Sequence, residues 1–135
     1  MGLLDRFKQQ THPKASEKNL FFKWLNMTLA VELASEIHAI NFNLYEDAEN
    51  KWSIELVGTS TFDESSEDWA CCEVFSTRDN PFVIERKSDW KAVEEMFRNW
   101  VNDYLRNGKY ADKLKQFGAV GLGFVDGDIR ILFKR

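Results

Sequence analysis

The residues best equipped for chemistry lie in one short segment, Thr61–Phe75, which reads TFDESSEDWACCEVF. Carboxylates act as general acids and bases and as ligands for hard cations, thiols act as nucleophiles and redox groups, and an indole can anchor a partner. The segment contains all three kinds of group. Its candidate functional residues are Asp63, Glu64, Glu67, Asp68, Trp69, Cys71 and Cys72.

Catalysis by this segment would have to depend on its carboxylates. The chain has only His12 and His38, whereas zinc hydrolases and triad enzymes need histidine as a ligand or a base. It also lacks the G-x-S-x-G, P-loop and HExxH motifs. Acid–base chemistry by carboxylates alone stays open, but side chains on one polar loop are poorly preorganised for it. The sequence leaves open whether the protein is an enzyme, and we expect that it is not.

Metal binding and redox chemistry have weak sequence support. The order D-E-S-S-E-D lacks the alternate ligand positions and the central glycine of an EF-hand loop, so we expect no metal and no cofactor. Adjacent cysteines can join only through a strained ring, and the C-x-x-C spacing of thioredoxin-like sites is absent. We therefore expect one of the two thiols to point into the core and the other to face the surface.

Trp69 has two interpretations. In the first, its ring folds back as a buried lid over the edge of a sheet and fixes the acidic loop. In the second, it is an exposed aromatic anchor surrounded by carboxylates, as in interface hot spots. The first is slightly favoured, since tryptophan is mostly buried in folded proteins.

Charge is unevenly distributed along the chain. The net charge is −4, but residues 36–80 contain 11 acidic and 2 basic side chains. Such a block repels nucleic acid and attracts basic partners. We therefore expect a protein partner with a basic surface and no binding to nucleic acid.

The 135 residues predict one domain, residues 16–135, preceded by a flexible N-terminal arm at residues 1–15. No apolar run approaches the roughly 20 residues of a membrane-spanning helix, and the N-terminus lacks the apolar core of a signal peptide. The expected location is therefore the cytoplasm, without membrane contact.

Two amphipathic helices are predicted. Ser16 is the expected cap of a helix that starts near Glu17 and ends between residues 29 and 35. Ser88 is the expected cap of a second helix over residues 89–106, which Asn107 and Gly108 terminate. Their apolar stripes comprise Leu20, Phe21, Trp24, Leu25 and Thr28 in the first, and Trp90, Val93, Phe97, Trp100, Val101 and Tyr104 in the second.

Alternation of apolar and polar residues predicts the strands. A half-buried strand from His38 and a second strand from Trp52 form a hairpin with a five-residue loop, Asp47–Lys51, that pairs Leu44 with Ile54. Short strands are expected at residues 73–77 and 82–85.

The last hairpin is predicted from Asp126-Gly127, the pair most typical of a two-residue type I′ turn. That turn would pair Phe124 with Ile129. Gly121 and Gly123 then share the opposite face, where we expect them to leave packing space for a helix, with a ligand groove as the alternative.

These elements predict an α+β fold: a single domain with a mostly antiparallel sheet of about five to six strands and two main helices packed on one face. The segments ELASEI, NFNLYE, WSIELVGTSTF, EDWACCEVF and GFVDGD resemble a family of small bacterial cytosolic proteins of uncharacterised function. In size, class and charge the chain is also similar to immunity proteins of bacterial toxin systems.

The resemblance and the charge pattern together predict a non-enzymatic interaction protein, such as an immunity protein. It would bind a basic toxin or another basic partner through Asp63, Glu64, Glu67, Asp68 and Trp69. The alternative is a domain that binds a small molecule or a divalent metal, including a hydrolase that uses the same carboxylates.

Overall fold

The computed structural model describes residues 16–135, so the predicted arm at residues 1–15 lies outside the described residues. Within them the chain forms three α-helices, one short 3-10 helix and six strands. In chain order these are α2 (Glu17–Leu29), β1 (Ala39–Ala48), β2 (Lys51–Thr59), η1 (Glu67–Cys71), β3 (Glu73–Ser76), β4 (Phe82–Glu85), α3 (Trp90–Asn107), α4 (Ala111–Leu114), β5 (Ala119–Phe124) and β6 (Arg130–Lys134).

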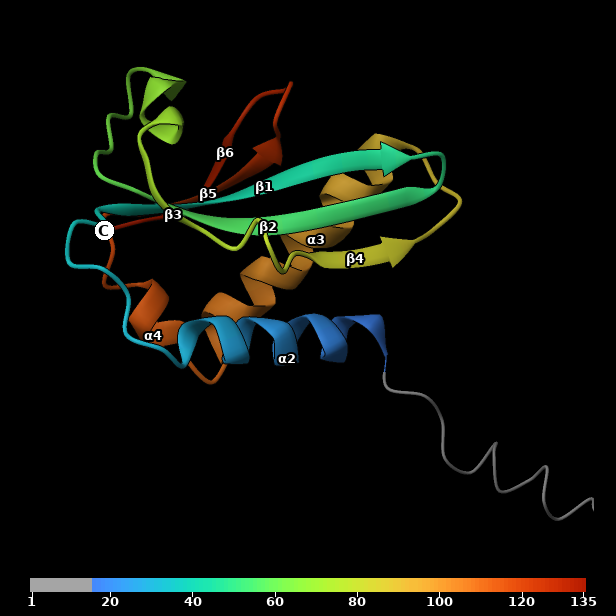
Figure 1. Cartoon of the computed structure of the whole chain (residues 1–135), viewed down its shortest axis with the longest axis horizontal. Coiled ribbons are helices and arrows are strands. Elements are labelled where there is room, and N and C mark those ends of the chain that lie inside the picture. Colours follow the sequence, from blue (N-terminus) through green and yellow to red (C-terminus); the bar gives the residue numbers. More distant parts are fainter. Residues whose placement is uncertain (1–15) are drawn as a thin grey trace, which may run out of the picture.

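The six strands form one sheet in the order β3-β2-β1-β5-β6, and β4 pairs with β2 as well. All pairs are antiparallel except β1 with β5, which is parallel. The predicted α+β class, single domain and mostly antiparallel sheet are confirmed. Figure 1 shows α2, α3 and α4 on one side of this sheet and η1 on the other.

The hairpin of β1 and β2 has the predicted register, with Leu44 opposite Ile54. Its loop is shorter than predicted, because β1 continues to Ala48 and β2 begins at Lys51. Asn50 adopts a left-handed conformation with φ of 61°, which asparagine tolerates better than most residues and which allows a tight turn. The prediction of a half-buried strand is wrong for the first part of β1, since Ala39–Phe42 are all buried, the polar residue Asn41 included.

The cap of α2 is confirmed: the side chain of Ser16 accepts a hydrogen bond from the backbone N–H of Asn19. Leu20, predicted to belong to the buried stripe, is exposed, and Leu29 takes part in the core instead. The last turn of α2 has no basic residue of its own. Lys113 of α4 supplies one, and its ammonium donates to the carbonyls of Leu29 and Val31.

The cap of α3 is Asp89, one residue later than predicted, because the Asp89 carboxylate accepts from the N–H of Ala92. A carboxylate is also the better cap electrostatically at the positive end of a helix. The predicted end is confirmed, since α3 stops at Asn107.

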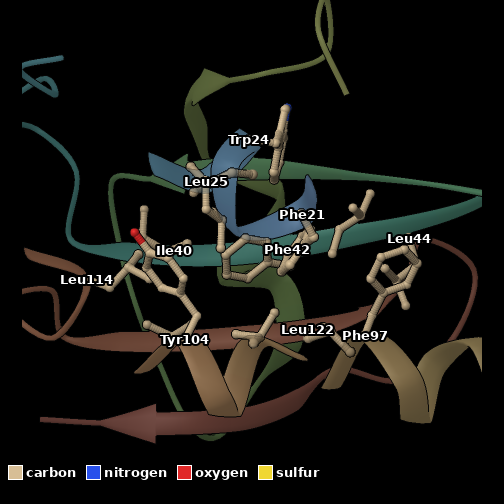
Figure 2. Close-up of a cluster of buried hydrophobic side chains, with 14 of the residues drawn as sticks. Phe21, Trp24, Leu25, Ile40, Phe42, Leu44, Phe97, Tyr104, Leu114 and Leu122 are labelled. Atoms are coloured by element: carbon tan, nitrogen blue, oxygen red, sulfur yellow. The ribbon is translucent and has the colours of Figure 1, made fainter. Parts of the chain in front are cut away.

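The main core lies between these helices and one face of the sheet (Figure 2). Phe21 of α2 and Phe97 of α3 meet there with ring centroids 5.8 Å apart. Phe42 of β1 is completely buried beneath them. Each fully buried side chain of this size contributes about 1.5–3 kcal/mol to folding, so this layer carries most of the stability.

The last hairpin differs from its prediction. Val120 pairs with Phe133, but a bulge follows and Leu122 pairs with Arg130, so the predicted pair of Phe124 with Ile129 does not form. A type I′ turn requires positive φ angles, and neither Asp126 nor Gly127 has one. The strands therefore separate after Leu122, and a longer turn connects them.

This longer turn explains the two strand glycines. A Cβ on Gly123 would collide with the backbone carbonyl of Asp128, and one on Gly121 would lie 2.9 Å from the Cγ2 of Ile129. The space that the glycines leave is occupied by the chain's own return segment. The prediction that they leave packing space for a helix is wrong for Gly123, whereas the position of a Cβ on Gly121 also lies 3.4 Å from the ring of Trp69 in the short helix η1.

None of the helices within residues 16–135 is both long enough and apolar enough to cross a membrane.

Candidate functional site

The acidic loop, residues 60–72, lies over the face of the sheet opposite the main helices (Figure 1). The Asp63 carboxylate accepts hydrogen bonds from the hydroxyl and the backbone N–H of Ser65, and these bonds lower the pKa of Asp63. Ser66 caps η1 by accepting from the N–H of Asp68. Serines interleaved with the carboxylates therefore give the loop a defined shape.

Trp69 is buried, with 4% of its surface exposed. Its ring packs edge-on against Phe62, with ring centroids 5.1 Å apart, and belongs to a small cluster with Ala39 and Ala119 at one end of the sheet. The interpretation of Trp69 as an exposed aromatic anchor is wrong. It is the buried lid that attaches the acidic loop to the sheet.

The four loop carboxylates point to different partners. Glu64 pairs with Lys134 of β6 at 2.8 Å, and Glu67 accepts from the backbone N–H of Ile129 at 3.0 Å. Asp63 is engaged with Ser65, while Asp68 is exposed. No group of three or more potential metal-ligating side chains occurs within residues 16–135. The structure thus spreads these carboxylates along a surface and does not bring them together around one point.

Cys71 and Cys72 are both free and both exposed. The prediction that one thiol points into the core is wrong. The tight 3-10 turn and its cap at Cys72 direct the Trp69 side chain inward, and neither of the two following thiols replaces it in the core.

A polar network lies beneath the loop, and sequence reasoning did not identify it as a site. It starts at Glu55 in the centre of β2, which is 1% exposed. One carboxylate oxygen, Oε2, accepts from the hydroxyl of Tyr45, the side-chain amide of Asn43 at 3.2 Å and the guanidinium of Arg78 at 3.1 Å. The side-chain amide of Asn41 in turn donates to Asn43 at 2.6 Å.

The network reaches the sheet edge through Arg78, which also pairs with Glu73 at 2.9 Å. Hydrogen bonds to Glu55 and Glu73 raise the pKa of Arg78 above its already high ordinary value. Burial and the hydrogen bond to Glu55 raise the pKa of Tyr45. At neutral pH the network therefore combines a guanidinium, neutral hydroxyl and amide groups, and buried acceptor oxygens.

A hollow of about 450 Å³ opens between this network, the acidic loop and the β5–β6 turn, and we call it the acidic hollow. Its charged lining residues are Glu67, Asp68 and Glu73, and no basic side chain of the described chain lines it. The rest of its lining is Asn41, Asn43, Tyr45, Ala70, Cys71, Phe124, Val125, Gly127 and Ile129.

A second hollow of about 550 Å³ adjoins the first, since Tyr45 and Phe124 line both. Trp90, half exposed at the start of α3, stacks edge-on against Phe124 and forms its aromatic wall. Its charged lining residues are Glu46 and Asp126, again without a basic side chain from the described residues. Carboxylates therefore line both adjoining hollows, and the second hollow adds an aromatic wall.

One sequence signal for this site was visible. Asn41 and Asn43 alternate with the core residues of β1, and Glu55 interrupts the otherwise apolar centre of β2. A carboxylate at such a position needs partners on the same face of the sheet.

Comparison with known proteins adds no assignment, since no family model, no curated protein and no solved structure matches the chain.

Proposed function

We propose that this protein is a non-enzymatic interaction protein that binds a basic partner protein through its acidic face. The acidic face comprises the loop carboxylates Asp63, Glu64, Glu67 and Asp68 together with the acidic hollow beside them. One observation carries the proposal: within the described residues, every charged side chain that lines either hollow is a carboxylate.

The charge distribution along the sequence also supports binding to a basic partner. The acidic block of residues 36–80, with 11 acidic and 2 basic side chains, contributes β1, β2, the loop and β3. Carboxylates gathered on one surface accelerate the encounter with a cationic partner, and salt screens this attraction over about 8–10 Å. The association should therefore be fast and sensitive to salt.

Trp69 has a supporting role in this proposal. Because it is buried against Phe62, it is not available as a contact for the partner. Its contribution is to hold the loop against the sheet, so that the carboxylates are presented on a rigid base. Preorganisation of this kind lowers the entropy cost of binding.

The fitting partner class is a protein with a cationic active site, such as a nuclease-type toxin. Carboxylates on a rigid surface can substitute for the phosphates that such a site binds. In that role the chain would act as a cytoplasmic immunity protein in a bacterium, in line with its resemblance to small acidic proteins of toxin systems.

The proposal is tested by affinity capture from native cells at low and high salt, read by mass spectrometry. The test variant changes Asp63 and Asp68 to Asn, and Glu64 and Glu67 to Gln. The matched control changes four exposed carboxylates outside the loop: Glu32, Glu36, Glu49 and Glu85, each to Gln. A basic partner should bind the wild type and the control at low salt, and should be lost at high salt or with the test variant. Capture of the same partner by the test variant would contradict the proposal.

A further inference from the structure

The hydrogen bonds from Asn41 through Asn43 run from donor to acceptor toward Glu55, because the polar network begins at that carboxylate. An ionised carboxylate only accepts hydrogen bonds, so the NH₂ group of Asn43 must face Glu55. The Asn43 oxygen then faces Asn41, which must present its own NH₂ group in return. The amide orientations follow from this order, and the oxygen of Asn41 is left at the far end.

That terminal oxygen has no hydrogen-bond partner within residues 16–135. Asn41 is 2% exposed and lines the acidic hollow. The Asn41 oxygen and the Cγ2 of Ile129 both lie above Gly121, within 3.0 Å of where a Cβ on that glycine would be. The oxygen itself is buried, so a donor would reach it only if the side chain of Ile129, a partly exposed residue of the β5–β6 turn, moved aside.

The hollow therefore offers acceptors to a ligand. Besides the Asn41 oxygen it contains the exposed carboxylate of Asp68 and the carboxylates of Glu67 and Glu73, which already accept from Ile129 and Arg78. None of its described lining residues is basic. A buried acceptor without a partner costs free energy, and a neighbouring negative potential favours a donor that is also a cation. The chemistry of the hollow selects a positively charged group with several N–H donors.

We propose that the acidic hollow binds the guanidinium group of an arginine side chain of the partner, with the Asn41 oxygen as its deepest acceptor. This inference rests on the proposed function and specifies one contact of that interface. A guanidinium has five N–H donors in a plane and is weakly hydrated, so it fits a site with acceptors on several sides. Tyr45 and Phe124 provide aromatic surface beside it, and Ala70 and Ile129 provide apolar surface for the stem.

The size of the hollow agrees with this occupant. A volume of about 450 Å³ lies within the range of small-ligand sites and exceeds what a single water needs. The adjoining aromatic hollow would then take the residue next to this arginine in an extended segment, against Trp90 and Phe124.

The test uses the full chain and N-acetyl-arginine amide as the probe, followed by NMR of backbone and side-chain amides. We expect saturable shifts confined to the lining residues, including the side-chain NH₂ of Asn41. N-acetyl-citrulline amide has the same shape without the charge, and N-acetyl-lysine amide has the charge without the planar donors. Both control probes should bind at least about tenfold more weakly than the arginine probe, since hydrogen bonds to charged groups are the stronger ones. Equal affinity for either control, or shifts that do not saturate, would overturn the inference.

Two variants locate the contact. Asn41→Ala removes the terminal acceptor and should weaken binding of the arginine probe about tenfold or more. Asp68→Asn removes an exposed lining carboxylate with little risk to folding and should weaken it severalfold. Glu49→Gln changes an exposed carboxylate in the β1–β2 turn and should leave affinity unchanged. Unchanged affinity in both Asn41→Ala and Asp68→Asn would contradict the assignment.

These results are separable from the test of the proposed function. If the arginine probe does not bind, yet neutralising the loop still abolishes capture of the basic partner, the arginine contact is overturned and the acidic face stands. If the probe binds as described, yet the neutralised loop captures the partner normally, the contact stands and the role of the loop carboxylates is overturned.

Discussion

Asn41 and Phe42 are neighbours in β1, and they face opposite sides of the same sheet. Phe42 is completely buried among apolar side chains of α2 and α3, where contact area and packing determine its contribution (Figure 2). Asn41 is almost equally buried, but its surroundings are an amide, the acidic loop and the acidic hollow. Burial alone therefore does not distinguish the two faces. They differ in whether each buried polar group has a hydrogen-bond partner.

The two faces of the sheet therefore have separate roles. The apolar face buries its side chains by close packing, and the indoles and hydroxyl among them have hydrogen-bond partners, so it stabilises the fold. The polar face leaves the oxygen of Asn41 and the second oxygen of Glu55 without partners in the described chain. A protein retains unsatisfied buried acceptors at a cost in stability, and binding sites are where such a cost is offset by a ligand.

The largest expected effect is on the apolar face. Phe42→Ala should destabilise the protein by about 3–5 kcal/mol, because it leaves a cavity in a layer that cannot collapse fully. Urea denaturation followed by tryptophan fluorescence measures this change. Val83→Ala, an exposed position in β4, is the control and should change stability by no more than about 0.5 kcal/mol. A loss of less than about 1 kcal/mol for Phe42→Ala would contradict the assignment of the core.

A smaller effect is expected at the centre of the polar face. Glu55→Gln retains the shape but removes the charge that Tyr45, Asn43 and Arg78 share, so it should cost about 2 kcal/mol. It also allows the amides to reverse, since glutamine can donate. Denaturation measures the first effect, and NMR titration with N-acetyl-arginine amide measures the second as weaker binding. A variant with unchanged stability and affinity would show that the network has no organising role.

The next effect is a pH dependence. Burial and the hydrogen bond to Glu55 raise the pKa of Tyr45 above the 10.0 of an unfolded tyrosine. The hydroxyl therefore stabilises the folded state fully below pH 10.0, and this contribution is lost as pH rises through the folded pKa. Tyr45→Phe should be about 1 kcal/mol less stable than the wild type at neutral pH, and the difference should shrink above pH 10.0. A difference that stays constant or grows at alkaline pH would contradict this cause.

The smallest effect concerns the rim of the acidic face. Glu64 and Lys134 form an exposed ion pair, and such pairs contribute about 0–1 kcal/mol. Glu64→Gln should therefore leave unfolding nearly unchanged, and it should slow association with the basic partner at low salt, with the difference vanishing at high salt. Stopped-flow or surface-based kinetics would measure it, with Glu85→Gln as the control. A large loss of stability would show that the loop is structurally more important than its exposure indicates.

Much of the fold was predictable because the apolar pattern is regular. The alternation along residues 38–44 and 52–57 determined the β1–β2 register, and polar caps marked both long helices. The parallel pairing of β1 with β5 was not predictable, since it joins residues some 80 positions apart in the sequence through no local signal.

The site was predicted only in part, for physical reasons. The acidic loop was recognisable from composition, but whether Trp69 faces inward depends on the space that Gly121 and Ala119 leave at the end of the sheet. The β5–β6 turn was misassigned because Asp-Gly is compatible with several turns, and a bulge after Val120 selected a longer one. From the sequence, Asn41 and Asn43 are ordinary outward-facing residues of a strand. Only the fold shows that the acidic loop and the β5–β6 turn lie over them.

The most direct test of the division between the two faces is a pair of neighbouring substitutions, Asn41→Ala and Phe42→Leu, each examined by urea denaturation and by titration with N-acetyl-arginine amide. Asn41→Ala should lower affinity about tenfold or more and change stability by about 1 kcal/mol. Phe42→Leu should lose about 1–2 kcal/mol of stability and bind the probe with the affinity of the wild type. Equal affinity in Asn41→Ala and the wild type, or a loss of affinity only in Phe42→Leu, would contradict the division between the two faces.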